Sequence, residues 1–190
     1  MLSFPKLPFL IGNDICRLAR ISRILQSRVG PRFVHRILRT EEIQHATTAR
    51  ILRCILEQSA QGSQDAQSIP KGVAEARDTR SFTRAVEFMA GRFAAKEAVI
   101  KAHPHRRLTF QRIAILRVTI SPEGSVFETS RELGPRPNET SQGGPLVACI
   151  KADESGQRDM YASVSISHDT DYATAVCLGL TRRPRRYTYT

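Results

Sequence analysis

The chain has 190 residues, of which 41% are hydrophobic and 25% are charged, a composition typical of a globular domain with a core of its own. No apolar run is long enough to span a bilayer, and the four cysteines lack the paired spacing of zinc or redox motifs. The net charge of +11 indicates a polyanionic partner, whereas the absence of tryptophan and the 6% aromatic content argue against single-strand nucleic-acid binding by base stacking.

The first two predicted elements are a buried strand and a helix. Residues 8–15 are largely apolar and include Gly12 and Asn13, residue types that let a chain turn sharply, so we expect a strand that ends there. Asp14 has two interpretations: it caps the next helix, or it delivers a carboxylate to a site at the strand end. Residues 15–26 carry apolar side chains at helical spacing, which predicts the helix.

Arginine dominates the beginning of the chain. Seven arginines fall within the first 39 residues, and no acidic residue lies between Asp14 and Glu41. A face that is merely solvated usually mixes both signs of charge, so we interpret this one as a docking surface for an anionic partner. The arginines are Arg17, Arg20, Arg23, Arg28, Arg32, Arg36 and Arg39.

The middle of the chain is predicted to hold two helices separated by a loop. The first helix covers about 40–57, and the second covers about 82–102. Residues 58–80 are rich in Gln, Ser, Gly and Ala and show no apolar period, which is typical of a long surface loop.

The second of these helices carries its charges in two narrow stripes. Arg92 and Lys96 share one stripe, Glu97 and Lys101 share the other, and apolar side chains flank both. We therefore expect a helix packed on two sides, with charged groups in grooves where an ion needs a partner. An ordinary salt bridge between Glu97 and Lys101 is the simpler interpretation of the second stripe.

The C-terminal half is predicted to consist mainly of strands. Pro104 ends the helix, and we interpret His103 and His105 as part of a solvated or phosphate-facing loop because no third metal ligand accompanies them. Alternation and β-branching predict strands, and a hairpin turns at residues 169–171. The predicted strands cover 108–121, 147–151, 160–168 and 172–180. Helices followed by strands indicate an α+β fold.

Two motifs in this sequence resemble those of the 4′-phosphopantetheinyl transferases. Residues 11–21, which begin Ile-Gly-Asn-Asp-Ile, look like the first motif, and residues 88–102, with the core Arg-Phe-Ala-Ala-Lys-Glu-Ala, look like the second. The chain is most similar to the holo-acyl-carrier-protein synthase group, since residues 32–41, 108–110 and 164–168 match that group in the same order. The central match is the specific one.

The resemblance implies an antiparallel sheet packed against a long central helix, in a single domain spanning residues 1–190. It also implies an enzyme that moves the 4′-phosphopantetheine arm of coenzyme A onto a serine of an apo acyl carrier protein and releases adenosine 3′,5′-bisphosphate. Residues 58–80 and 122–145 look like loop insertions relative to the group. The group is homotrimeric, with sites shared between neighbouring subunits, so a homotrimer is implied here.

The resemblance also implies roles for individual residues. Asp14 and Glu97 correspond to Mg²⁺ ligands and, with Lys101, to catalytic residues. Either Glu97 or a metal-bound water would be the base for the carrier serine. Coenzyme A binding is implied for Arg92, Lys96, Lys101 and His168.

Three arginines of the first helix, Arg17, Arg20 and Arg23, are implied to bind the acidic recognition helix of the carrier. This accounts for the net charge of +11 without a nucleic-acid or membrane partner. The alternative is a basic nucleic-acid-binding protein without catalysis, whose affinity would fall steeply with salt. We expect an intracellular protein, mitochondrial or cytoplasmic; the sequence names neither the compartment nor the carrier.

Overall fold

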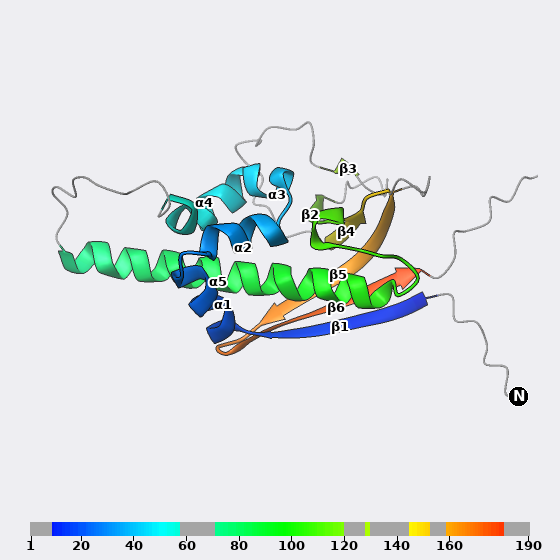
Figure 1. The fold of residues 1–190 in the computed structure, drawn as a ribbon, viewed down its shortest axis with the longest axis horizontal. Helices are drawn as coiled ribbons and strands as arrows, with labels where there is room; N and C mark the ends of the chain where they lie inside the picture. Colours follow the sequence, from blue (N-terminus) through cyan, green and yellow to red (C-terminus); the bar gives the residue numbers. More distant parts are fainter. Residues whose placement is uncertain (1–8, 58–70, 120–127, 130–144, 153–158, 181–190) are drawn as a thin grey trace, which may run out of the picture.

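The computed structural model describes residues 9–57, 71–119, 128–129, 145–152 and 159–180. Over these ranges it confirms the expected α+β class, with an antiparallel sheet packed against a long helix (Figure 1). None of the helices in the described ranges has the length and apolar character that a membrane span requires.

The elements follow the chain as one strand, five helices and five strands within the described ranges. The helices are α1 (Leu18–Gln26), α2 (Gly30–Ile37), α3 (Thr40–Gln44), α4 (Ala46–Leu56) and α5 (Lys71–Ala102). The strands are β1 (Phe9–Arg17), β2 (Ile113–Thr119), β3 (Glu128–Thr129), β4 (Leu146–Ile150), β5 (Met160–His168) and β6 (Tyr172–Leu180). A 3₁₀ turn, Phe110–Arg112, precedes β2.

The sheet joins the first strand of the chain to the last. Its strand order is β1-β6-β5-β4-β2-β3, so among the described strands β1 lies at one edge and pairs with β6 alone. That pairing is antiparallel and runs from Phe9 opposite Leu180 to Arg17 opposite Tyr172. The β5–β6 hairpin has the predicted bounds and turns at residues 169–171.

Helix α5 lies between two layers, as its apolar residues on two sides predict (Figure 1). One side contacts β1, β5 and β6, and the other contacts α1, α2 and α4. The sheet approaches the helix closely because the facing residues are small: a Cβ at Gly12 would lie 1.9 Å from the carbonyl oxygen of Ala98. Ala94, Ala98 and Ala102 are buried in this contact region.

The sheet face opposite α5 carries exposed apolar side chains on β1 and β6. Ile11 and Ile15 are 64% and 65% exposed, and the register places Ile11 opposite Leu178. Alternation along a strand sends neighbouring side chains to opposite faces, so these residues share the face that α5 does not cover. The exposed apolar residues of this face, which we call the open sheet face, are Phe9, Ile11, Ile15, Val176, Leu178 and Leu180.

Four predicted boundaries are wrong. The strand expected from residue 108 begins at Ile113, because a 3₁₀ turn precedes it. Helix α5 begins at Lys71, so residues 71–80 of the predicted loop are helical, and their Ala, Glu and Arg content favours a helix. Strand β1 continues to Arg17, which places Asp14 inside the strand and not at the cap of α1. The predicted helix over 40–57 is divided at His45, whose backbone is extended.

The remaining parts of the two predicted insertions, 58–70 and most of 122–145, lie outside the described residues. The short strand β3 falls within the second of them and pairs with β2. The assignment of 1–190 to one domain with insertions stays a prediction.

Candidate active site

Asp14 faces α5 from the edge strand of the sheet. Along β1, Gly12 and the side chains of Asp14 and Cys16 lie on the face toward the helix, while the residues between and beside them are exposed. The close contact of Gly12 with Ala98 brings this part of β1 against the last two turns of α5. The backbone of Asp14 is held from the other side, because the Thr174 hydroxyl donates to its carbonyl oxygen at 3.0 Å. The carboxylate is thus carried by a fixed backbone.

Lys101 reaches Asp14 from the last turn of α5. Its Nζ lies 2.7 Å from Asp14 Oδ1 and donates a second hydrogen bond to the Asn13 carbonyl oxygen at 3.1 Å. The Lys101 side chain is 51% exposed, whereas that of Asp14 is 14% exposed. The hydrogen bond to Asp14 is the main cause that raises the pKa of Lys101, and the charge of Glu97 raises it further. The ammonium is therefore charged at neutral pH.

Glu97 completes this group one helical turn before Lys101. Its side chain is half-buried, and residues four apart on a helix lie on the same side. Both carboxylates act on the same ammonium, as the raised pKa of Lys101 indicates. We call Asp14, Glu97 and Lys101 the carboxylate–lysine cluster. The structure brings the three predicted catalytic residues together.

Two carboxylates around one cation suit a divalent ion. The Lys101 ammonium is a positive charge paired with Asp14 and within the electrostatic range of Glu97, and Mg²⁺ prefers few carboxylates with water and phosphate in its remaining positions. No three His, Cys, Asp or Glu side chains of the described residues gather into a metal centre. An ion at Asp14 and Glu97 would therefore need oxygen ligands from outside this set.

Lys96 does not belong to the cluster. Its side chain is fully buried, and Nζ donates to Glu42 Oε2 at 2.5 Å, to the Ile37 carbonyl oxygen at 2.7 Å and to the Phe110 carbonyl oxygen at 3.3 Å. Burial is the main cause that lowers its pKa, and the neighbouring Glu42 opposes this. Because the protein itself accepts these donors, the predicted role of Lys96 in coenzyme A binding is corrected to a structural one.

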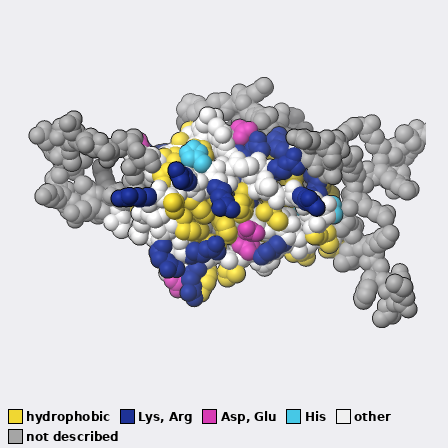
Figure 2. All heavy atoms as spheres, viewed as in Figure 1, with side chains coloured by type: hydrophobic (Ala, Val, Ile, Leu, Met, Phe, Trp, Pro, Cys, Tyr) yellow, Lys and Arg dark blue, Asp and Glu magenta, His cyan; other side chains and the backbone are white. Residues whose placement is uncertain are grey.

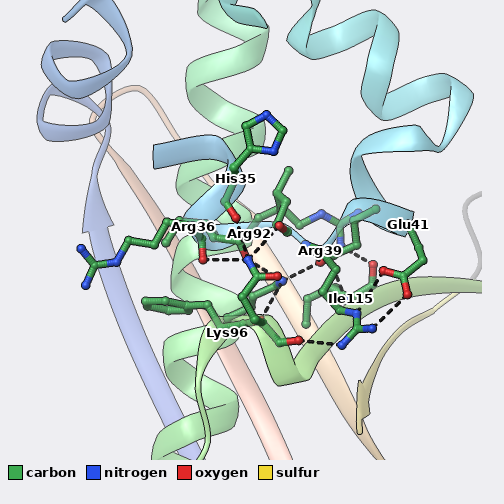
Figure 3. Close-up of polar contacts among 12 residues, drawn as sticks. His35, Arg36, Arg39, Glu41, Arg92, Lys96 and Ile115 are labelled. Carbon is green, nitrogen blue, oxygen red and sulfur yellow. Dashed lines mark hydrogen bonds and ion pairs between the residues drawn. The ribbon is translucent and has the colours of Figure 1, made fainter. Parts of the chain in front are cut away.

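Lys96 holds α5 to the connection between α2 and α3 (Figure 3). Its partner Glu42 also accepts from the backbone N–H groups of Arg39 at 3.0 Å and Ile115 at 3.1 Å. Beside it, the Gln111 amide donates to carbonyl oxygens of the last turn of α2 and of the residue that follows it, namely His35, Arg36 and Leu38. We call Lys96 and Glu42, with the backbone groups that they bond, the buried polar cluster; the exposed Gln111 lies at its edge. Sequence reasoning missed Glu42 and Gln111, because Glu42 pairs with Lys96 54 residues away and the carbonyl oxygens to which the Gln111 amide donates are at least 73 residues away.

Arg92 points to the same side as Lys96. Its Nη1 donates to the Ile115 carbonyl oxygen at 2.9 Å, and its guanidinium lies 5.0 Å from the ring centroid of Phe88. Burial lowers the pKa of Arg92. The side chain thus reaches β2 at Ile115 (Figure 3), whereas Lys101 meets β1. Within a single subunit, the Arg92 guanidinium therefore binds β2 and lies apart from the carboxylate–lysine cluster.

His168 ends β5 on the same sheet face as Asp14. The register pairs His168 with Ala173, and Ala173 with Cys16, so two strand spacings separate it from β1. Two spacings amount to about 10 Å. His168 is exposed, and the fold of one chain does not bring it into contact with the carboxylate–lysine cluster.

His103 is buried directly after α5, in contrast to the predicted solvated loop. Its Nδ1 donates to the Val99 carbonyl oxygen at 2.8 Å, which leaves Nε2 without a proton. Among the described residues Nε2 has no hydrogen-bond partner. The ring is covered by β6, since a Cβ at Gly179 would lie 2.8 Å from it. Burial is the main cause that lowers the pKa of His103.

The basic surface begins beside the cluster. Arg17 donates to the Tyr172 hydroxyl at 3.0 and 3.2 Å, and this bond raises the pKa of Arg17. The Arg20 guanidinium lies 5.4 Å from the ring centroid of Phe93, which precedes Glu97 by one helical turn. Arg23 is exposed one turn after Arg20. Figure 2 shows Lys and Arg side chains gathered where α1 lies, next to an apolar area.

Comparison with known proteins finds one family model and a set of relatives. The model described as the 4′-phosphopantetheinyl transferase superfamily matches residues 10–177. A holo-[acyl-carrier-protein] synthase from Ralstonia nicotianae is 27% identical over 169 residues, covering 87% of this chain and 86% of the relative. The holo-[acyl-carrier-protein] synthase from Burkholderia mallei is 26% identical over 166 residues, covering 86% and 82%.

Solved structures of similar proteins overlap with most of the chain. The Chronobacterium ammoniagenes ACPS–CoA complex has 22% identity and a TM-score of 0.49, and covers 92% of this chain and 98% of that one. A holo-ACP-synthase from Plasmodium yoelii has 18% identity and a TM-score of 0.47, and covers 92% and 95%.

Proposed function

The chain belongs to the 4′-phosphopantetheinyl transferase superfamily, and we propose that it transfers the 4′-phosphopantetheine arm of coenzyme A to a serine of an apo acyl carrier protein. The serine oxygen forms a new ester bond to phosphorus while the pyrophosphate bond breaks and adenosine 3′,5′-bisphosphate leaves. The observation that carries the proposal is the carboxylate–lysine cluster, in which two carboxylates and one ammonium converge between β1 and α5.

Asp14 and Glu97 would hold Mg²⁺. The Lys101 ammonium beside Asp14 supports this, because a positive charge is already accommodated at that position. When bound, the ion stabilises the negative charge that develops on the transferred phosphate. Glu97 is half-buried beside this position and is the candidate acceptor of the serine proton. Each carboxylate comes from a different element, so their spacing depends on the contact of β1 with α5.

Lys101 supplies a mobile positive charge. It is protonated at neutral pH because its pKa is raised, and it stands on an exposed four-carbon side chain. From the end of α5 it would donate to pyrophosphate oxygens and stabilise the leaving phosphate. Lys96 has no part in this step, since its ammonium is inside the protein.

The carrier would be recognised by Arg17, Arg20 and Arg23. These side chains are exposed on one edge of the molecule, and Arg20 lies over Phe93 within one turn of Glu97. A carrier helix with acidic side chains on this surface would present its serine to the cluster. Electrostatic attraction of this kind accelerates association and fixes orientation.

We propose further that the enzyme is a homotrimer whose sites lie between subunits. The open sheet face supports this, because several large apolar residues would be removed from water there. The position of His168 also supports it: this residue is remote from the cluster of its own chain, so a role at the nucleotide would require a neighbouring subunit.

The test is intact-mass spectrometry of an apo acyl carrier protein incubated with this protein, coenzyme A and Mg²⁺. We expect a mass gain of one phosphopantetheine that EDTA abolishes. The matched control is an incubation without coenzyme A. A protein that modifies none of several carriers, yet binds nucleic acid with an affinity that falls steeply with salt, would favour the nucleic-acid-binding alternative.

A further inference from the structure

We infer that Lys101 is the resident counter-ion of Asp14, and that it exchanges with the divalent cation during each loading of the site. Asp14 Oδ1 accepts from the Lys101 ammonium at 2.7 Å, so a divalent cation bound to this carboxylate would stand next to a like charge that repels it. The inference rests on the proposed function, in which Asp14 is a metal ligand.

The position of Lys101 is defined by two acceptors. Besides Asp14 Oδ1, the ammonium donates to the Asn13 carbonyl oxygen at 3.1 Å. Both acceptors belong to β1, whose backbone is fixed by its pairing with β6 and by the hydroxyl of Thr174. The ammonium is therefore positioned on the strand and does not simply extend into solvent.

Lys101 can nevertheless leave, in contrast to Lys96. The Lys96 side chain is 0% exposed and donates to three acceptors, so its departure would strand a buried carboxylate. Lys101 is 51% exposed on the last turn of α5 and can pass into water without crossing packed side chains. Exposed ion pairs of this kind are weak. A divalent cation that binds both Asp14 and Glu97 can displace it.

The exchange links two ligands. While Lys101 neutralises Asp14, the cluster carries two negative charges and one positive charge. A cation that takes over the carboxylates releases the ammonium, which is then available for phosphate oxygens. Conversely, a phosphate that attracts the ammonium uncovers Asp14. The divalent cation and coenzyme A would thus each raise the affinity for the other, as reciprocal coupling requires.

The test measures Mn²⁺ binding to the full-length protein by electron paramagnetic resonance, without coenzyme A. We expect Lys101→Gln to tighten Mn²⁺ binding about fivefold, because an exposed ion pair no longer competes. Lys101→Arg keeps the competing charge and should bind Mn²⁺ like the natural protein. Lys151→Gln, which removes the remote ion pair with Asp159, is the matched control and should change nothing. A merely structural Lys101 would give no tightening.

A second titration measures the coupling. Coenzyme A should tighten Mn²⁺ binding to the natural protein more than to Lys101→Gln, since the variant has no ammonium to withdraw. Unchanged or weaker Mn²⁺ binding by Lys101→Gln would overturn the exchange and leave the proposed reaction intact. Asp14→Asn distinguishes a failure of the exchange from a failure of the proposed transfer reaction. If this variant binds Mn²⁺ as tightly as the natural protein, both the metal assignment of Asp14 and the exchange are refuted. The carrier assay then tests the transfer reaction independently.

Discussion

Lys96 and Lys101 stand five residues apart on the same helix and have opposite surroundings. Lys96 is fully buried in the buried polar cluster, and burial lowers its pKa. Lys101 is half exposed at the carboxylate–lysine cluster, and its ion pair with Asp14 raises its pKa. One cation fastens α5 to the α2–α3 connection, and the other meets β1 where a ligand can reach it.

The comparison of these two lysines shows that exposure, and not residue type, decides which partners a charged side chain can bind. A buried ammonium binds protein groups alone, whereas an exposed one can also reach a ligand. A buried ammonium with several protein acceptors has no free donor for a substrate, and its loss leaves a buried carboxylate unpaired. An exposed ammonium with the same partner type can change partners at low cost. The two charged stripes of α5 therefore have different surroundings, although each contains a lysine.

The strongest test of the functional side of α5 is Glu97→Gln. We expect turnover to fall by about 100-fold or more, because a charged ligand and candidate base is lost where phosphate charge develops. The free energy of unfolding should change little, since the side chain is only half-buried. The measurement is the rate of carrier modification together with urea unfolding. Glu87→Gln, another half-buried glutamate of α5, is the control; near-normal turnover of Glu97→Gln would show that the metal assignment is wrong.

The structural side is tested by Lys96→Met. We expect the free energy of unfolding to fall by about 3–5 kcal/mol, because Glu42 would be left buried with an unpaired charge. Urea unfolding measures this loss, and adding Glu42→Gln should restore part of it by removing the stranded charge. If Lys96→Met were fully stable and instead lost coenzyme A affinity, Lys96 would return to the nucleotide site.

The basic surface is tested by Arg20→Glu. We expect the KM for the carrier to rise about tenfold, since reversing one charge in an electrostatic interface weakens docking. The KM for coenzyme A should change less, and the thermal midpoint should stay close to that of the natural protein. Arg53→Glu on α4 reverses an exposed charge elsewhere and serves as the control. Equal effects of both reversals would mean that net charge, and not this surface, attracts the carrier.

His103 gives a smaller, pH-dependent effect on stability. Its pKa is lowered in the folded protein, so below the ordinary value of about 6.5 the unfolded chain takes up the proton first. The stabilisation is fully present above that pH and is lost as pH falls, with a slope of at most about 1.4 kcal/mol per pH unit. Urea unfolding across this range should show a shallower slope for His103→Gln than for the natural protein. The control is His45→Gln at an exposed position, which should leave the slope of unfolding free energy against pH as in the natural protein. If His103→Gln also left this slope unchanged, the pH dependence could not be attributed to His103.

Much of this architecture follows from local patterns. The β5–β6 hairpin, the end of α5 before Pro104 and the packing of α5 on two sides are predicted by alternation, by proline and by apolar periodicity. The meeting of Asp14, Glu97 and Lys101 was predicted from the motifs, which place them in a fixed order.

What local patterns missed depends on contacts between distant segments. Glu42 lies 54 residues from Lys96, so helical spacing alone could not show that Lys96 is neutralised inside the protein. The burial of His103 depends on Gly179 of the last strand. The distance of His168 from the cluster follows from the order of three strands, which spacing along the chain does not determine.

The pairing of β1 with β6 sets an order of events during synthesis. Asp14 leaves the ribosome long before β6, the strand with which β1 pairs in the described part of the sheet. A nascent chain that stops before Tyr172 contains Asp14, Glu97 and Lys101, yet lacks the strand that holds the Asp14 backbone in place. The carboxylate–lysine cluster would thus be assembled only once β6 is made, and chains that stop earlier would carry its residues without the arrangement.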